Sequence, residues 1–165
     1  MPGPSGRLSL DLVRCAAKRI EHKTNRTEAD LRRSISDLYY ALFHAVCEEL
    51  AKLAPGNTDD AAFKDVYRSL YRWPSHGPLL QKCQEIQKNN DVSANLKRFA
   101  QWLATMKAKR DIADYDPTAR ISGSEVENDA LTTTYVLHDF LSGSEKHRQQ
   151  FVLLLTVDPK RSRQS

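Results

Sequence analysis

The sequence predicts an all-α protein, an up-and-down bundle of about five to six helices. Apolar residues recur at helical spacing in one segment after another, and no window alternates with a period of two for long enough to form a sheet. The 165 residues fit a single domain, which at this size buries about two thirds of the surface exposed by the unfolded chain. We expect a flexible segment over residues 1–8, one helical domain over residues 9–156 and a basic flexible tail over residues 157–165.

The elements of the first half follow from apolar spacing and from residues that start or stop helices. Leu10, Val13 and Ile20 share one helix face, and Thr27 with acidic residues behind it is a typical helix start. Pro55-Gly56 and Trp73-Pro74 interrupt the pattern. The expected segments are residues 9–22, residues 27–53, a segment that restarts at residues 58–60 and continues until Trp73-Pro74, and residues 78–86.

In the second half, Ser93 is expected to cap a helix that runs to Tyr115, because Asp116-Pro117 ends it. Ser122-x-x-Glu125 is a possible capping box for a helix that ends at Gly143. A final segment over residues 145–156 carries further apolar residues.

Composition places the chain among reduced, intracellular proteins. Cys15, Cys47 and Cys83 are odd in number, far apart and set in apolar helical patterns, so they do not suggest a disulfide framework. No secretory signal or long apolar run is recognisable, and we therefore expect a cytoplasmic protein that does not enter a membrane. The formal net charge is +4, but the C-terminal PKRSRQS supplies three of these charges, so overall charge is weak evidence for nucleic acid.

The stretch Leu38–Cys47, LYYALFHAVC, holds ten residues without a formal charge and predicts a helix buried on all sides. A buried imidazole needs a partner, and His44 shares a helix face with Ser36 and Tyr40, which precede it at intervals of four. Either His44 has a chemical role or it holds the packing by bonding a neighbouring helix. A metal shared with Cys47 is disfavoured, because no second ligand cluster is present.

The segment before Pro117 carries an arginine on an apolar helix face. Leu96, Leu103 and Arg110 are spaced by seven, so Arg110 points inward and must be paired. Asp114, four residues later, is the nearest candidate, with Asp111 at the side. An internal ion pair that staples the helix end would account for this pattern.

Two motifs together resemble the small stand-alone HEPN (higher eukaryotes and prokaryotes nucleotide-binding) proteins. Ser34–Ala45, SISDLYYALFHA, resembles their S-x-x-YYAxFHA signature, and Lys107–Pro117, KAKRDIADYDP, resembles their KxxRxxADYxP segment. The order, separation and helical setting of the two motifs also agree. The resemblance covers the chain from about Leu10 to Phe140.

The resemblance implies a helical bundle that is usually dimeric. The superfamily includes many metal-independent ribonucleases of toxin–antitoxin and antiviral systems. Its small members are often encoded beside a minimal nucleotidyltransferase, so the resemblance also implies an antitoxin of this kind as a possible partner. The active site of these ribonucleases pairs an arginine with a histidine further along the chain, with four to six residues between the two. Arg110 matches that arginine, whereas Tyr115, Asp116 and Pro117 occupy the positions of the histidine.

We therefore expect a protein that acts on RNA, as a ribonuclease that uses neither a metal ion nor a cofactor. The alternative is a non-catalytic module that dimerises and binds a nucleotide, RNA or a protein partner. We expect His76, which follows Trp73-Pro74, to lie in a turn, so that His44 is the histidine placed to reach Arg110. The candidate catalytic residues are Arg110, His44, Tyr115 and Asp114, and the candidate substrate-binding residues are Ser36, Tyr40, Asp111 and Lys107.

Overall fold

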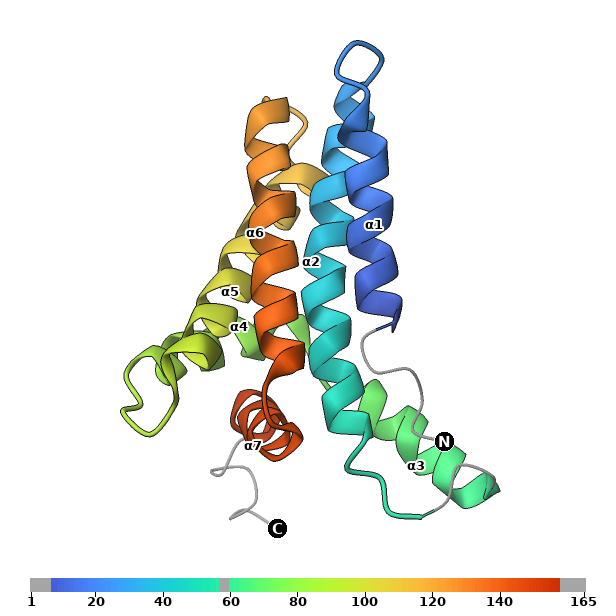
Figure 1. Cartoon of the computed structure of the whole chain (residues 1–165), viewed down its shortest axis with the longest axis vertical. Coiled ribbons are helices and arrows are strands. Elements are labelled where there is room, and N and C mark those ends of the chain that lie inside the picture. Colours follow the sequence, from blue (N-terminus) through green and yellow to red (C-terminus); the bar gives the residue numbers. More distant parts are fainter. Residues whose placement is uncertain (1–6, 57–59, 158–165) are drawn as a thin grey trace.

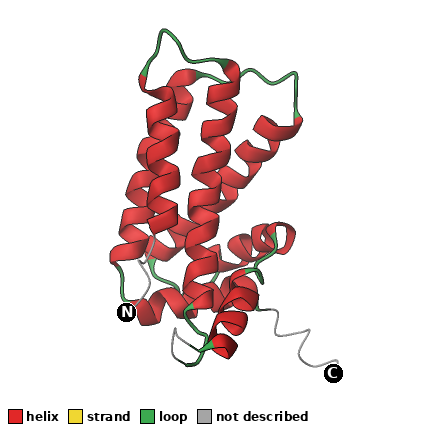
Figure 2. Cartoon of the chain, turned by 90° about the vertical axis from the view of Figure 1, so that its right-hand side faces the viewer, coloured by secondary structure: helices red, strands yellow, loops and turns green. Residues whose placement is uncertain are grey.

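The computed structural model describes residues 7–56 and 60–157, and all regular structure within them is α-helical (Figures 1 and 2). The predicted all-α bundle is confirmed. None of the described helices is long and apolar enough to cross a lipid bilayer. The helices are α1 (Arg7–Glu21), α2 (Glu28–Ala51), α3 (Ala61–Tyr71), α4 (His76–Gln87), α5 (Ala94–Tyr115), α6 (Gly123–Ser142) and α7 (Glu145–Thr156).

The described part of the chain thus holds seven helices, more than the five to six predicted. The excess comes from the short helices, which are α3, α4 and α7. Helix α1 begins at Arg7, so the last two residues of the predicted flexible segment are helical. Residues 1–6 of that segment, and residues 158–165 of the predicted tail, lie outside the described residues.

The helix starts show which capping signals operate. Thr27 caps α2 through a capping box with Asp30, whose carboxylate accepts from the Thr27 N–H at 2.8 Å. Ser93 and Ser122 occupy N-cap positions, but neither side chain accepts a capping hydrogen bond from a backbone N–H of its helix. The predicted box at Ser122 is wrong because Glu125 instead pairs with Lys109 of α5, Oε1 to Nζ 2.7 Å.

Helices α1, α2 and α6 run side by side along the long axis of the molecule, and α5 is inclined to them (Figure 1). The short helices α3, α4 and α7 gather near one end (Figures 1 and 2). Helix α2 packs against α1, α3, α5, α6 and α7. This central position explains why α2 carries the longest charge-free stretch of the sequence.

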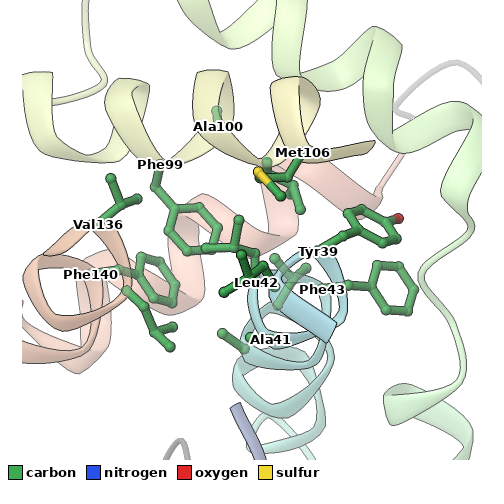
Figure 3. Packing of buried hydrophobic residues seen from close by; sticks show 14 of the residues in the cluster. Tyr39, Ala41, Leu42, Phe43, Phe99, Ala100, Met106, Val136 and Phe140 are labelled. Atoms are coloured by element: carbon green, nitrogen blue, oxygen red, sulfur yellow. The ribbon is translucent and has the colours of Figure 1, made fainter. Parts of the chain in front are cut away.

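The core forms around the predicted buried stretch of α2. Within Leu38–Cys47 only Tyr40 and His44 are not fully buried. Figure 3 shows Leu42 at the centre, with Phe99 and Phe140 on one side and Tyr39 and Phe43 on the other. Phe99 of α5 stacks on Phe140 of α6 with ring centroids 4.1 Å apart.

The position of Leu42 generates a stability prediction. Leu42 is 0% exposed, and Leu42→Ala removes buried methyl groups. The aromatic rings around it cannot move far enough to fill the resulting cavity. We expect the free energy of unfolding, measured by urea denaturation, to fall by about 2–5 kcal/mol. The matched control is Leu131→Ala on α6, which is 71% exposed and should change stability by less than about 0.5 kcal/mol. Equal losses in the two variants would contradict the assignment of the core.

Candidate functional site

A polar cluster lies where the C-terminal end of α5 meets α2. The Arg110 side chain is 14% exposed, and its Nε lies 2.6 Å from Asp114 Oδ2 one helical turn later. The Nε–H is not aligned with that oxygen, so this contact is an ion pair rather than a hydrogen bond. Nη1 donates to Asp111 Oδ1 at 3.3 Å. The inward arginine is therefore paired within its own helix, as its spacing required.

Helix α2 completes the cluster from the other side. Arg110 Nη2 donates to the Tyr40 hydroxyl at 3.1 Å, and the guanidinium carbon lies 5.5 Å from the centroid of the Tyr40 ring. Ser36 Oγ donates to Asp114 Oδ1 at 2.5 Å. Both contacts join the Ser34–Ala45 motif to the Lys107–Pro117 motif, so the two sequence motifs meet in space.

The charges of the cluster cancel. Lys107 forms an ion pair with Asp111, and Arg110 lies between Asp111 and Asp114. Two formal positive charges therefore face two negative ones. A phosphate group that approaches Arg110 competes with carboxylates already in place.

Tyr115 forms the open side of the cluster. It is 70% exposed, and the Arg110 guanidinium carbon lies 5.2 Å from the centroid of its ring. One aromatic residue of α2 and one at the end of α5 thus contact the same guanidinium. The Tyr115 ring and hydroxyl remain available to a partner from solvent.

His44 has its hydrogen-bond partner on α3 rather than in the Arg110 cluster. The Tyr71 hydroxyl lies 2.7 Å from His44 Nδ1, and the two rings stack with centroids 5.8 Å apart. Burial lowers the pKa of His44 below its usual range, so the ring is neutral at pH 7. His44 remains next to the cluster through Tyr40, whose ring centroid lies 6.1 Å from its own. The packing role and a chemical role therefore remain compatible.

His76 lies next to the cluster, although the sequence did not indicate this position. It is the first residue of α4, not part of a turn as predicted. Its ring stacks on Phe43 with centroids 4.2 Å apart and lies edge-on to Tyr40 at 6.1 Å. Its Nδ1 lies 2.5 Å from the Tyr39 hydroxyl. Burial is the main cause that lowers the pKa of His76, and the positive charges of Arg110 and Lys107 lower it further.

A sequence signal for the start of α4 existed. Ser75 occupies the N-cap position and Pro78 falls in the first turn, where a missing N–H costs no hydrogen bond. The Trp73-Pro74 pair masked this signal by indicating a turn. That His76 then contacts α2 depends on how α4 packs, which no local pattern determines.

Two of the three cysteines, Cys47 and Cys83, are buried. Burial raises the pKa of Cys47 to about 12, and that of Cys83 likewise, so neither thiol is ionised at neutral pH. Within residues 7–56 and 60–157, no group of three or more His, Cys, Asp or Glu side chains is arranged to hold a metal ion. A hollow between α4 and α5 contains none of the predicted site residues and is lined by Cys83, Gln84, Gln87, Gln101, Ala104 and Thr105.

The structure brings seven of the eight candidate residues into direct contact with one another, and His44 adjoins them through Tyr40. The chain matches no family model, no curated protein and no solved structure. Its function is therefore inferred from the chemistry of this cluster and from the two motifs that the cluster joins.

Proposed function

We propose that the protein is HEPN-like and acts on RNA, and that the cluster around Arg110 cleaves RNA without a metal ion. The contact of Arg110 with Tyr40 supports this most directly, because it joins the two HEPN-like motifs across 70 residues of sequence. In this proposal the protein is the toxin-like component of a bacterial toxin–antitoxin or antiviral system and works in the cytoplasm.

The residues at hand fit the needs of metal-free RNA cleavage. The 2′-hydroxyl attacks the adjacent phosphate, so the site must supply a base, a cation and a donor to the leaving oxygen. Arg110 provides the cation, and the neutral imidazole of His44 is the base. Tyr115 presents an exposed hydroxyl as a donor. Ser36, Tyr40 and the carboxylates position Arg110, and Lys107, which pairs with Asp111, adds a second cation to bind the substrate.

A non-catalytic HEPN module is the second candidate. It is favoured by the charge balance, since Asp111 and Asp114 already neutralise the two cations of the cluster. In that case Arg110, Asp114 and Tyr115 hold α5 against α2, and the protein dimerises and binds a nucleotide, RNA or a protein partner. Removing Arg110 then affects stability alone.

RNA cleavage is the first test. We expect the wild type to cleave single-stranded RNA in the presence of EDTA, and Arg110→Ala to slow cleavage by about 100-fold or more, because the developing charge loses its cation. Arg98→Ala is the matched control on α5, since the Arg98 side chain is 49% exposed and outside the cluster. If the wild type cleaves no RNA in excess over substrate and with its partner removed, the non-catalytic candidate takes over.

The pH profile and His44→Gln refine this test. A base must be unprotonated, so cleavage should rise with pH, with a midpoint below about 6.5 because burial lowers the pKa of His44. His44→Gln cannot transfer a proton and should stop cleavage in a folded protein. Should it cleave as fast as the wild type, His44 is a packing residue and another group acts as base.

Arg110→Ala also makes a stability prediction. The substitution leaves Asp111 and Asp114 without their shared partner, and we expect the free energy of unfolding to fall by about 1–3 kcal/mol. Arg98→Ala should cost less than about 1 kcal/mol, because Arg98 lies 3.5 Å from Asp139 in an exposed pair. Chemical denaturation of both variants measures the difference. Equal stability of the two would mean that Arg110 does not fasten α5 to α2.

The partners form part of the proposal. We expect a two-fold homodimer in which a second copy completes the RNA cleft, and a cognate antitoxin such as a minimal nucleotidyltransferase. A stable dimer of this kind should bury more than about 1,000 Å². Light scattering at micromolar concentration should give twice the chain mass of 18.8 kDa. A monomer mass would rule out the dimer and weaken the catalytic candidate with it.

A further inference from the structure

His76 is fastened to α2 at three points. Its ring stacks on Phe43 and lies edge-on to Tyr40, and its Nδ1 lies 2.5 Å from the Tyr39 hydroxyl. These contacts fix the plane of the imidazole. The ring nevertheless stays half-exposed, and its Nε2 has no hydrogen-bond partner among the described residues.

The Tyr39 contact determines which nitrogen of His76 carries the proton. Tyr39 is 0% exposed, and burial raises the pKa of its hydroxyl, which therefore stays protonated. A buried O–H needs an acceptor, and His76 Nδ1 is the polar atom within reach in the described structure. The hydroxyl accordingly donates to Nδ1, and the neutral ring carries its proton on Nε2.

His44 differs from His76 in this respect. Its partner Tyr71 is half-exposed, so the Tyr71 hydroxyl can turn to water and accept from the imidazole instead of donating. His44 can therefore adopt either tautomer and can present a bare Nε2 as a base. His76 cannot take up a proton on Nδ1 without breaking the bond from Tyr39.

His76 and Arg110 act in one electrostatic environment. Both contact the ring of Tyr40, and the positive charge of Arg110 lowers the pKa of the His76 imidazole. The other ionisable groups that influence His76 are Lys107 and Asp111 of α5 and His44 of α2. A neutral N–H donor beside a guanidinium is suited to an oxygen that carries negative charge.

We propose that His76 is a phosphate-binding residue, which donates its Nε2–H to a phosphodiester oxygen of single-stranded RNA bound at Arg110 and does not itself transfer a proton. This inference rests on the proposed function, because the RNA substrate comes from it. It separates the roles of the two histidines: His44 exchanges the proton, and His76 holds the phosphate.

Two substitutions of His76 test the proposal. His76→Gln retains an N–H donor and an oxygen that can accept from Tyr39, whereas His76→Phe retains the aromatic stack and loses the donor. The probe is a single-stranded oligodeoxynucleotide, which lacks the 2′-hydroxyl and cannot be cleaved. We expect His76→Gln to bind it within about threefold of the wild type, and His76→Phe to bind about tenfold more weakly, as for the loss of one hydrogen bond. Cleavage of RNA should follow the same order.

Nitrogen-15 NMR of the wild type gives a measurement that needs no variant. The His76 shifts should show the Nε2–H tautomer from pH 6.5 to 8, and the Nε2–H signal should move when the oligodeoxynucleotide is added. An Nδ1–H tautomer, or a signal unmoved by a probe that binds, would overturn the inference.

The outcomes separate the inference from the function on which it rests. If the wild type cleaves RNA and His76→Phe, folded by circular dichroism, binds and cleaves equally well, the inference fails and the proposed function stands. If the probe binds through His76 but no RNA is cleaved, the phosphate site stands and the catalytic proposal fails. If no oligonucleotide binds at all, both fail.

Discussion

Helix α2 is packed against five other helices, and this burial constrains every polar group that it carries. A buried polar atom without a partner costs about 1–3 kcal/mol, and six of the polar residues of α2 contact a polar side chain on a neighbouring helix. The partners come from several helices rather than from one. The pairs are Asp37 with Arg19 of α1, Ser36 with Asp114 and Tyr40 with Arg110 of α5, His44 with Tyr71 of α3, Tyr39 with His76 of α4, and Glu49 with Arg148 of α7.

These pairs give the bundle directional contacts in addition to apolar packing. Hydrophobic contacts alone tolerate small shifts of one helix along another, whereas a hydrogen bond to a buried group does not. The pairs join α2 to α1, α3, α4, α5 and α7. Helix α6 packs against α2 without one of these pairs. The polar residues of α2 thus set the register of the helices around it.

The candidate site lies where this network reaches solvent. Tyr40 and His44 are the two residues of Leu38–Cys47 that are not fully buried, and Arg110, His76 and Tyr115 surround them. The formal charges there cancel, so the phosphate binding that we propose relies on directed donors and aromatic faces more than on net charge. The same balance lets the cluster fasten α5 to α2 when no ligand is bound.

Local pattern sufficed for the parts of this protein that depend on periodicity. The all-α class and the pairing of Arg110 with Asp114 follow from spacings of three, four and seven, because a helix repeats every 3.6 residues wherever it occurs. The burial of Leu38–Cys47 follows from its ten residues without a formal charge. Family resemblance, and not periodicity, suggested that the His44 face meets Arg110.

Tertiary packing alone decided the partner of His44 and the place of His76. Tyr71 and His76 lie on short helices whose local sequences carry no information about which face of α2 they cover. Their positions result from the fit of whole helices around α2, which involves residues distant in the chain. For the same reason the sequence specified which residue types the cluster contains, and only the fold determined that a second histidine lies beside it.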